Sequence, residues 1–342
     1  MSPKSDDESA APSRLGMPVA AVVIGRNEGG RLTACLESLN KAALPVVYVD
    51  SGSTDGSPAA AERMGASVVA LDESLSFTAA RARNAGVAAL VEAGARPDYV
   101  QFVDGDCEIA EGWIETARAF LDAHPDVAAV CGRLRERHPE RTIYNRLCDI
   151  EWDAPSGETT ACGGVAMFRL RPFKAAGGFR EDLPAGEEPE LCLRLREQGF
   201  AIHRLDAEMA WHDANMTAFS QWWRRMRRGG RAFAEVSSLH RRSPHRIWRR
   251  ETWRALAWAA LAPVAFVVGI VIHPIAFALL LAYPAQIARI ALRRDASASV
   301  NWVYGFFMTL AKFAEAQGVI DFWLARTASR AAATDFDSRS FR

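Results

Sequence analysis

The chain has 342 residues, with 41 basic and 41 acidic side chains that cancel at pH 7. This length exceeds one average domain and predicts a single large domain with an appendage. The balanced charge gives no global field that would attract nucleic acid, so we expect no nucleic-acid partner. Six cysteines are scattered without a CxxC pair, which predicts reduced thiols and argues against a disulfide framework or a structural zinc site.

The N-terminal segment, residues 1–16, is polar and contains Pro and Ser. We expect this tail to be disordered, because it has too few apolar side chains to pack. It also lacks the apolar core of a cleavable signal peptide, so no such peptide is predicted.

Residues 18–132 alternate short apolar runs with amphipathic stretches. The apolar runs predict strands at 19–24, 46–49, 67–71 and 99–103. Helical spacing of apolar residues predicts helices at 31–39, 79–93 and 113–123, with a further short helix that ends at residue 65. This alternation is typical of the α/β class, so we predict an open, mostly parallel twisted sheet with helices on both faces.

Polar triplets follow three of these strands, at residues 26–28, 50–52 and 104–106. Ligands of open α/β sheets bind beyond the carboxyl ends of the strands. We therefore expect the triplets to meet at one nucleotide site, with Glu28 among its residues.

The segment FVDGDCEI carries two acids separated by one glycine at a strand end. Residues two apart in an extended chain point the same way, so Asp104 and Asp106 can face one ligand. Gly105 lets the backbone bend and lets a ligand approach. Two carboxylates suit Mg²⁺ or Mn²⁺, which complete their shells with phosphate oxygens and water. The triplet therefore predicts a metal site for a diphosphate.

The turn DSGSTDGS follows the second strand. Asp50 can accept a hydrogen bond from a base or a ribose, and the small residues after it permit close backbone approach. The alternative is a capped turn, which we prefer for Asp55 because it precedes a helix.

Several motifs together resemble family 2 glycosyltransferases, in the order and spacing typical of that family. They are IGRNEGGRLTACLESL, YVDSGSTDGS, ARARNAGVAAL, FVDGDCEI, GGF and GEEPELCLRLREQGF. The resemblance covers residues 18–235 and implies the GT-A fold with inverting, metal-dependent transfer of a sugar from a nucleotide donor. It implies that Asp50 binds the nucleoside, that Asp106 is the principal metal ligand, and that Asp104 lies nearer the ribose or the metal.

The segment ARARNAGV resembles the part of this family that lies beside the base and the diphosphate. This implies nucleotide-sugar contacts for Arg83 and Asn84, and less directly for Arg81. Guanidinium groups pair well with phosphate. Helix-surface arginines and a structural asparagine remain open as alternatives.

The segment GEEPELC departs from the family, which usually has Glu-Asp with the aspartate as general base. Here the pair is Glu187 and Glu188, and Pro189 fits the first turn of a helix that runs to Gly199. A helix start favours the carboxylate, whereas the neighbouring like charge raises at least one pKa. Glu188 matches the base position. The alternative is a charge pair that only complements the helix.

Three further features are expected near the substrates. His212, 24 residues after Glu188 and beyond a predicted strand at 201–205, resembles a histidine that contacts metal or diphosphate in part of the family. Imidazole beside aspartates favours Mn²⁺ over Mg²⁺. The alternative for His212 is a hydrogen-bonded structural histidine. The sites predicted for acceptor or diphosphate are Gly163, Gly164, Gln221, Trp222 and Arg225. The alternative for the last three is an interfacial helix.

The C-terminal part has a membrane-like composition. Eleven arginines lie between 222 and 254, and residues 255–288 contain no Asp, Glu, Lys or Arg. Each half of this apolar segment is short for a membrane span, and arginines flank both ends, so we predict a membrane-embedded or re-entrant hairpin with both ends cytoplasmic. The alternative is a buried helical subdomain or an oligomer interface. Residues 300–313 predict an interfacial helix.

These features predict four segments and one principal function. The segments are a disordered tail at 1–16, a catalytic domain at 17–235 divided at residue 132 into nucleotide-sugar and acceptor halves, a membrane-associated helical region at 236–326, and a flexible tail at 327–342. The predicted function is sugar transfer to a lipid-linked or cell-envelope glycan at the cytoplasmic face of the inner membrane. Alternatives are a silent nucleotide-sugar-binding scaffold and a sugar nucleotidyltransferase.

Overall fold

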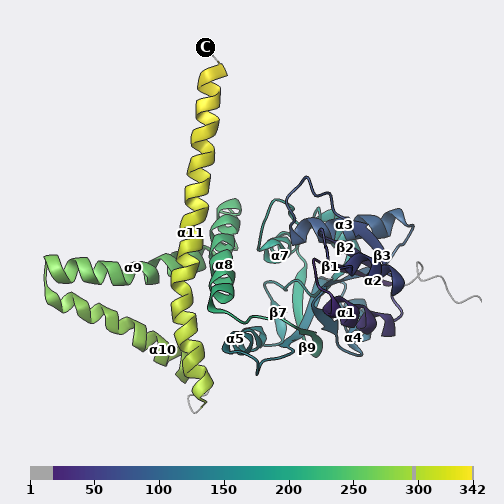
Figure 1. Cartoon of the computed structure of the whole chain (residues 1–342), viewed down its shortest axis with the longest axis horizontal. Coiled ribbons are helices and arrows are strands. Elements are labelled where there is room, and N and C mark those ends of the chain that lie inside the picture. The colour runs from purple at the N-terminus through teal and green to yellow at the C-terminus, as the bar shows by residue number, and fades with distance from the viewer. Residues whose placement is uncertain (1–17, 295–297, 341–342) are drawn as a thin grey trace, which may run out of the picture. The chain divides into compact units, whose positions relative to one another are not determined.

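The computed structural model describes residues 18–294 and 298–340, drawn as a ribbon in Figure 1. They divide into two compact units. We call residues 18–137, 151–182 and 187–214 the α/β unit, and residues 138–150, 183–186 and 215–340, except 295–297, the helical unit.

The α/β unit is built on a nine-stranded sheet. Its strands are β1 (Val19–Gly25), β2 (Val46–Asp50), β3 (Ser67–Ala70), β4 (Tyr99–Asp104), β5 (Cys107–Ile109), β6 (Val127–Glu136), β7 (Gly157–Thr159), β8 (Ala166–Arg169) and β9 (Ala201–His212). The order is β3-β2-β1-β4-β8-β6-β9-β5, and β7 pairs with β9. The four strands from β3 to β4 are parallel, whereas β8 is antiparallel to both of its neighbours. The predicted α/β class is confirmed.

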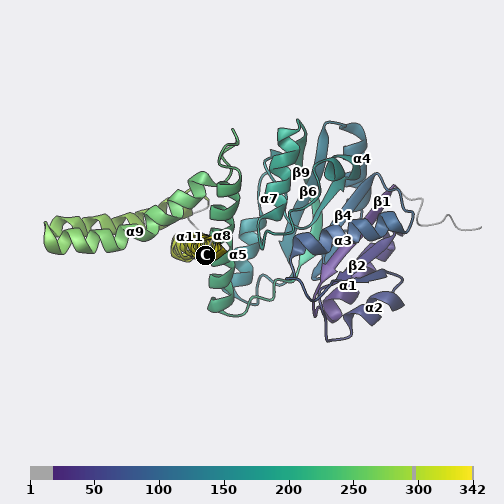
Figure 2. The ribbon, with the colours of Figure 1, turned by 90° about the horizontal axis from the view of Figure 1, so that it is seen from above.

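Helices cover both faces of the parallel strands. They are α1 (Gly30–Lys41), α2 (Ser57–Arg63), α3 (Ala79–Glu92), α4 (Trp113–Ala123), α6 (Leu170–Ala175) and α7 (Glu187–Glu197). Figure 2 looks onto the face that α3 covers, and α1 lies behind the same strands. Gly86 in α3 faces Val22 and Val49 so closely that an added Cβ would collide with Val22. The absence of a side chain there lets α3 lie directly on the sheet.

The core of this unit explains the apolar runs in the sequence. Residues of β1, β2 and β4 are almost all buried, as expected for parallel strands covered on both sides. The predicted strands and helices of residues 19–123 agree with the observed ones to within a few residues. The strand predicted at 201–205 is too short, because β9 continues to His212 through pairing with β6 and β5.

The helical unit contains most of the C-terminal chain. Its elements are most of α5 (Ile143–Trp152), then α8 (Phe219–Leu239), α9 (Arg249–Val271), the 3-10 helix η2 (Pro274–Leu281), α10 (Ala282–Leu292) and α11 (Ser299–Ser340). Helix α8 thus groups with the helical unit, whereas the predicted boundary at residue 235 lies near its end. Helix α11 begins at the predicted interfacial helix and continues into residues 327–340, for which the sequence predicts a flexible tail.

Glycines bring the helices of this unit into close contact. A Cβ on Gly318 of α11 would collide with the backbone of Arg227 in α8, and one on Gly230 would collide with the backbone of Glu315. A Cβ on Gly305 would lie 2.7 Å from the backbone oxygen of Ile287 in α10. Helix α8 therefore crosses α11 almost backbone to backbone, which explains why it belongs to this unit.

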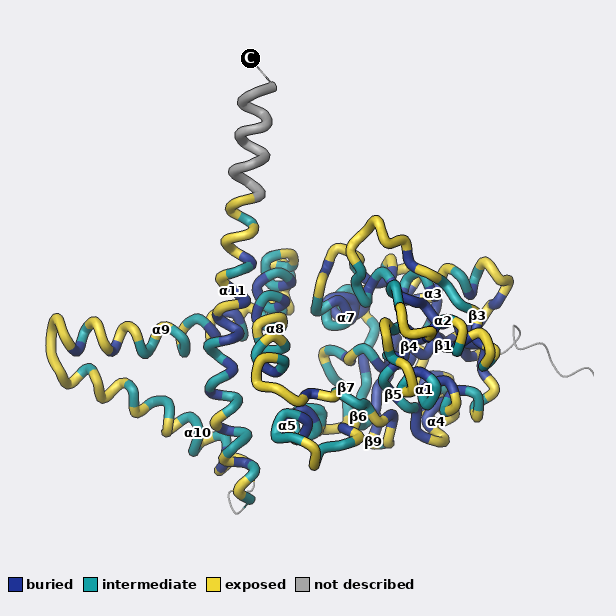
Figure 3. Tube along the Cα trace, in the orientation of Figure 1, coloured by how far each residue is buried: buried dark blue, intermediate teal, exposed yellow. Residues whose placement is uncertain are grey.

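The apolar segment forms a helical hairpin. One arm is α9, the other is η2 with α10, and the turn lies at His273 and Pro274. Two helical stretches, Arg249–Val271 and Pro274–Leu292, are long and apolar enough to cross a membrane, and only 17% and 11% of their most apolar windows are buried. Figure 3 shows that most of both arms is exposed or half-exposed. The buried-subdomain alternative is therefore not what the described residues form.

Candidate active site

The predicted polar triplets meet at one edge of the sheet. Gly25 at the end of β1 is in register with Asp50 of β2, and Ile24 is in register with Asp104 of β4. Because these three strands are parallel, their carboxyl ends lie side by side. This edge is where an open α/β sheet binds its ligands.

Asp50 is buried in the turn that follows β2. Its Oδ1 accepts from the Tyr48 hydroxyl at 3.0 Å, and its Oδ2 accepts from the backbone N–H groups of Gly52 and Ser53 at 3.0 and 2.8 Å. The side chain is only 4% exposed. Asp50 therefore holds the turn in shape, and its predicted contact with a nucleotide stays a prediction.

Arg83 of α3 is the centre of a buried ion cluster. Its Nη1 donates to Glu187 and to Glu188, each at 3.0 Å, and its Nη2 donates to Asp104 Oδ1 at 2.9 Å. The guanidinium also lies 5.5 Å from the centre of the Phe179 ring. Burial alone lowers the pKa of Arg83, but the three carboxylates outweigh it and raise the pKa above its ordinary value. Arg83 is thus engaged by protein carboxylates, where the resemblance implies a diphosphate contact.

Glu188 has the ionisation behaviour of a general base. It lies in the first turn of α7, next to Glu187. Burial first, and then the charge of Glu187, raise the pKa of Glu188 to about 7, although Arg83 acts in the opposite direction. A base with a pKa near 7 is half ionised at neutral pH, which is the range in which proton transfer is most efficient.

Of the predicted glycine pair, only Gly164 lies against this cluster. A Cβ on Gly164 would lie 2.8 Å from Asp104 Oδ2, 3.2 Å from Glu188 Oε1, and closer still to Arg83 Nη2. Gly163 has no heavy atom near its Cβ position. The absence of a side chain at Gly164 therefore lets the backbone lie close to the ion cluster.

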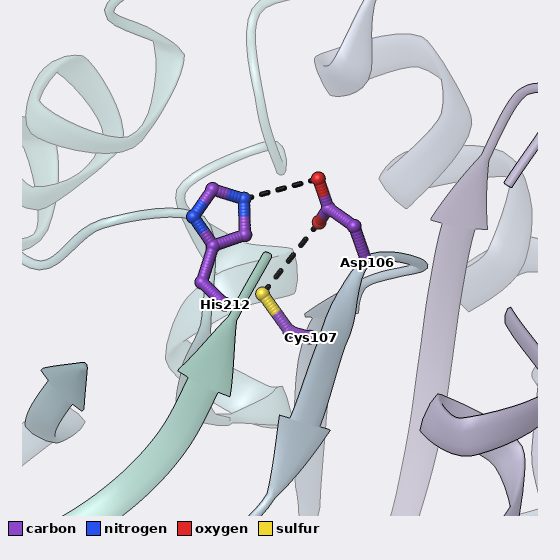
Figure 4. A group of neighbouring side chains, drawn as sticks. All are labelled: Asp106, Cys107 and His212. Carbon is purple, nitrogen blue, oxygen red and sulfur yellow. Dashed lines mark hydrogen bonds and ion pairs between the residues drawn. The ribbon is translucent and has the colours of Figure 1, made fainter. Parts of the chain in front are cut away.

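A second group joins Asp106 to His212, which lies 106 positions later in the chain. Strand β5 pairs with β9 so that Cys107 faces His212, and the Asp213 N–H donates to the Asp106 backbone oxygen. The imidazole Nε2 and the Asp106 Oδ2 lie 3.0 Å apart, as Figure 4 shows. The Trp152 ring lies 4.9 Å from the imidazole ring. Sheet pairing thus creates the juxtaposition that the resemblance implies.

The donor atoms of this group fit a divalent metal ion. The ligand atoms of Asp106, Cys107 and His212 lie within 4.8 Å of one another. Burial is the largest influence and opposes ionisation of Asp106, but the hydrogen bond and charge of His212 together with the charge of Arg31 and a backbone hydrogen bond outweigh it and lower the Asp106 pKa. Burial raises the pKa of Cys107 well above its ordinary value, and Mn²⁺ and Mg²⁺ prefer oxygen and nitrogen ligands to sulfur. One carboxylate and one imidazole are the groups available to Mn²⁺ or Mg²⁺, and Asp104 lies outside this group.

Glu28 lies behind the same edge. Burial, followed by the charge of Asp106, raises the pKa of Glu28. Its Oε2 pairs with Arg31 at 2.6 Å, and Arg31 donates through Nη1 to the Asp213 backbone oxygen at 3.3 Å. An added Cβ on Gly105 would lie 3.1 Å from the Glu28 side chain. Glu28 and Arg31 therefore support the loop that carries the acidic triplet.

Two residues predicted to contact the nucleotide, Arg81 and Asn84, also hold loops. Arg81 donates to three backbone oxygens in residues 72–76. Asn84 donates to the Phe179 backbone oxygen at 2.8 Å and to Glu181 at 2.9 Å, and accepts from the Phe179 N–H. The structural alternative that the sequence left open describes Asn84 well. A nucleotide contact for either residue stays a prediction.

The three predicted residues of α8 lie within the helical unit. Gln221 caps the helix, since its Oε1 accepts from the backbone N–H groups of Thr217 and Ala218 at 2.7 and 2.8 Å. Trp222 is fully buried, with its ring 5.1 Å from that of Phe307. Arg225 follows one turn later on the same helix. A role for these residues in acceptor binding stays a prediction.

Two residues that frame the site, Arg31 and Glu136, were not predicted from the sequence. Glu136 is 3% exposed, ends β6 in register with His212, and accepts from the Ala214 N–H at 3.1 Å. No motif marks Glu136, because its position depends on how β6 pairs with β9. Arg31 lies in the motif IGRNEGGRLTACLESL, and its spacing of three residues from Glu28 was the signal that could have predicted their ion pair.

Comparison with known proteins identifies the family of part of the chain. Residues 21–176 match the family model described as glycosyl transferase family 2. Residues 21–176 are therefore a glycosyl transferase family 2 segment. The match includes β1 to β4, the acidic triplet and Gly164, and it ends before α7.

Relatives of this chain include two bacterial proteins. The chain is 28% identical over 237 residues to the pre-mycofactocin glycosyltransferase of Mycobacterium tuberculosis, covering 65% of this chain and 48% of that protein. It is 27% identical over 219 residues to the succinoglycan biosynthesis protein ExoA of Rhizobium meliloti, covering 59% and 63%. The chain thus spans about half to two thirds of the length of these relatives.

A solved structure shares the fold over nearly the whole chain. The mannosyltransferase PcManGT from Pyrobaculum calidifontis, solved with GDP-Man and Mn²⁺, superimposes with a TM-score of 0.62 at 22% identity. The superposition covers 91% of this chain and 90% of that one. The expected GT-A-like fold is therefore confirmed, with apolar helices at its C-terminal end.

Proposed function

We propose that this chain transfers a sugar from a nucleotide-diphosphate donor to an acceptor hydroxyl with inversion at the anomeric carbon. The observation that carries the proposal is the buried arginine that links the strand-end acid to a base candidate. Arg83 contacts Asp104 at 2.9 Å and Glu188 at 3.0 Å. A nucleotide-sugar bound at this sheet edge would therefore lie beside the cluster that contains Glu188, which can accept the proton of the attacking hydroxyl.

Asp106 and His212 would hold the metal ion, Mn²⁺ or Mg²⁺. Carboxylate and imidazole are suitable ligands, and their facing atoms are 3.0 Å apart. When bound, the ion would supply positive charge that neutralises the leaving diphosphate. Glu28 and Arg31 would keep the loop of Asp106 in position.

Glu188 would take the proton from the acceptor hydroxyl as the oxygen attacks the sugar. As the carboxylate it accepts the proton, and its pKa of about 7 allows it to release that proton to water after the reaction. Arg83 holds the carboxylate in place through the transfer. Glu187 shares the same guanidinium and keeps the Glu188 pKa high.

The C-terminal helices support a membrane location for the enzyme. Exposed apolar arms flanked by arginines suit the cytoplasmic face of the inner membrane. A lipid-linked sugar or polyprenyl phosphate would reach the site from that surface, and a cell-envelope glycan would be the product. Three of the residues predicted to contact the acceptor or the diphosphate, Gln221, Trp222 and Arg225, lie in the helical unit that carries these arms.

The test is a transfer assay with the full chain in detergent, a panel of nucleotide-diphosphate sugars, Mn²⁺ and a membrane lipid extract. We expect one donor to give a product whose anomeric configuration, read by NMR, is opposite to that of the donor. Glu188→Gln should lower the transfer rate by roughly 10²–10⁴, whereas Glu187→Gln, which keeps the Glu188 carboxylate, should reduce it much less. Retention of configuration, or equal effects of the two variants, would contradict the mechanism. Donor binding without turnover for any donor would instead indicate a silent scaffold.

A further inference from the structure

The tip of the apolar hairpin is its most exposed part. Ile270, Val271, Ile272 and Ile275 are between 73% and 76% exposed. The only polar side chain between Gly269 and Leu281 is His273. A cluster of large apolar side chains at the end of a projecting element is costly in water, at about 25 cal/mol per Å², and indicates a partner that covers it.

The two arms of the hairpin hold each other in a defined shape. Near the tip the Phe277 ring packs on Gly269, where an added Cβ would lie 2.8 Å from it, and on Phe266 at 5.6 Å. Farther from the tip, the Tyr283 hydroxyl forms two hydrogen bonds with the backbone of α9. It donates to the Trp258 backbone oxygen at 2.8 Å and accepts from the Ala262 N–H at 3.1 Å. The hairpin is therefore a preformed element.

The turn satisfies its own backbone donors. The N–H groups of Ile272 and His273 both donate to the Val268 oxygen, at 2.9 and 3.0 Å. The next donor, from Ile275, goes to His273 Nδ1 at 3.2 Å. Pro274 has no N–H, and the Ala276 N–H donates to the His273 oxygen at 3.1 Å. In water the solvent can satisfy the donors of a turn, whereas in hydrocarbon no water is present to do so and an unsatisfied donor is unfavourable.

Charge and length set the depth that the hairpin can reach. The end of each arm that lies away from the tip, which we call its root, carries three exposed arginines. They are 249, 250 and 254 on one arm and 289, 293 and 294 on the other. From Arg254 to Val271 the α9 arm rises about 26 Å at ~1.5 Å per residue. A hydrocarbon core is about 30 Å thick. With the arginines at one interface, the tip falls short of the opposite interface, and any tilt shortens the reach further.

We propose that the hairpin enters an anionic bilayer with its tip first and returns to the same side without crossing. The tip around Ile272 lies in the acyl chains, and the six arginines lie among the headgroups, where each attracts anionic lipid. Figures 1 and 2 agree that the hairpin projects away from α11, so that α11 and α8 can lie along the surface. The inference deepens the membrane location given in the proposed function, but it rests on the hairpin alone.

Labelled tip and root positions test this topology. All six native cysteines are buried, so Ile272→Cys and Leu292→Cys each offer one reactive thiol for the fluorophore NBD in the full chain, reconstituted in vesicles of phosphatidylcholine with phosphatidylglycerol. We expect the tip label to be quenched most by nitroxides at the acyl chain ends, and the root label by nitroxides on the headgroup. The tip label should also resist dithionite added outside, and again after a pore-forming peptide opens the lumen. Ile275→Cys is the second tip position if Ile272→Cys fails to fold.

Other results would overturn the inference. Reduction of the tip label from the side opposite to the root label would mean that the hairpin crosses the bilayer. Reduction from the same side would mean that the tip is not inserted. Failure to float with vesicles, with a dimer in solution, would mean that a second copy covers the tip.

A charge variant measures insertion apart from catalysis. Ile272→Asp should lower the partition coefficient of the protein into vesicles by roughly 100-fold. It should leave donor turnover in detergent unchanged. Leu75→Asp is the matched control, because Leu75 is an exposed leucine of the α/β unit, at 57%, and should not change partition. Loss of turnover in the unmodified chain would count against the proposed function only, whereas unchanged partition of Ile272→Asp would count against insertion.

Discussion

The replacement of Gly164 by alanine tests the ion cluster with the addition of one methyl group. The new Cβ would lie 2.8 Å from Asp104 Oδ2 and 3.2 Å from Glu188 Oε1, and closer still to the Arg83 guanidinium. Arg83 has little room to yield, since it is 2% exposed and bound by three carboxylates. Overpacking of this kind costs roughly 1–3 kcal/mol. A displacement of the base by ~1 Å lowers kcat by roughly 100-fold.

The matched control is the neighbouring Gly163→Ala, whose Cβ meets no atom. We expect Gly164→Ala to lose most of its kcat and to unfold at a lower denaturant concentration, while Gly163→Ala keeps both values. Steady-state transfer at saturating donor and urea unfolding by circular dichroism measure the two effects. Equal kcat and equal unfolding midpoints for the two variants would refute the reasoning, because the cluster would then be free to move.

Three further predictions follow from the same geometry. The proposed base, Glu188, would act as the carboxylate, and its pKa is raised to about 7. Activity should therefore rise as the pH increases through 7, and a pH–rate profile of Glu188→Gln should lose this limb together with roughly 10²–10⁴ in rate. Asp106→Asn should weaken Mn²⁺ binding in calorimetry by roughly tenfold or more, whereas Cys107→Ser should leave it unchanged; a large effect of the serine variant would mean that the thiol is a ligand. Arg83→Met should destabilise the fold by about 3–5 kcal/mol, since it leaves buried carboxylates unpaired; urea unfolding of this variant at wild-type stability would contradict the buried cluster.

The parallel half of the sheet was predictable because its strands are buried on both faces. Such strands are continuous apolar runs, and β1, β2 and β4 stand out in the sequence. Strand β9 is half-buried, with Arg204, Asp206 and Glu208 among its residues. Those charges end the apolar signal near Leu205, although the backbone continues to pair as far as His212.

The site was predictable where chemistry lies in one short motif, and less so where distant segments meet. Asp106 and His212 were each singled out, but their contact depends on β5–β9 pairing. Arg83 was expected to face phosphate, because a sequence does not reveal that three acids 21 to 105 positions away converge on it. The burial that sets the Glu188 pKa likewise exists only in the folded chain.

The glycines of the helical unit also limit the depth of the insertion that we propose for the hairpin. Gly230 and Gly318 join α8 to α11, and Gly305 joins α11 to α10, each with backbone against backbone. Contacts without side chains have no rotamers through which to relax, so a methyl group at any of them must move a whole helix. These contacts therefore hold the arginines of α8 at a set distance from the tip at Ile272. An exchange of apolar residues along the arms would leave this distance unchanged.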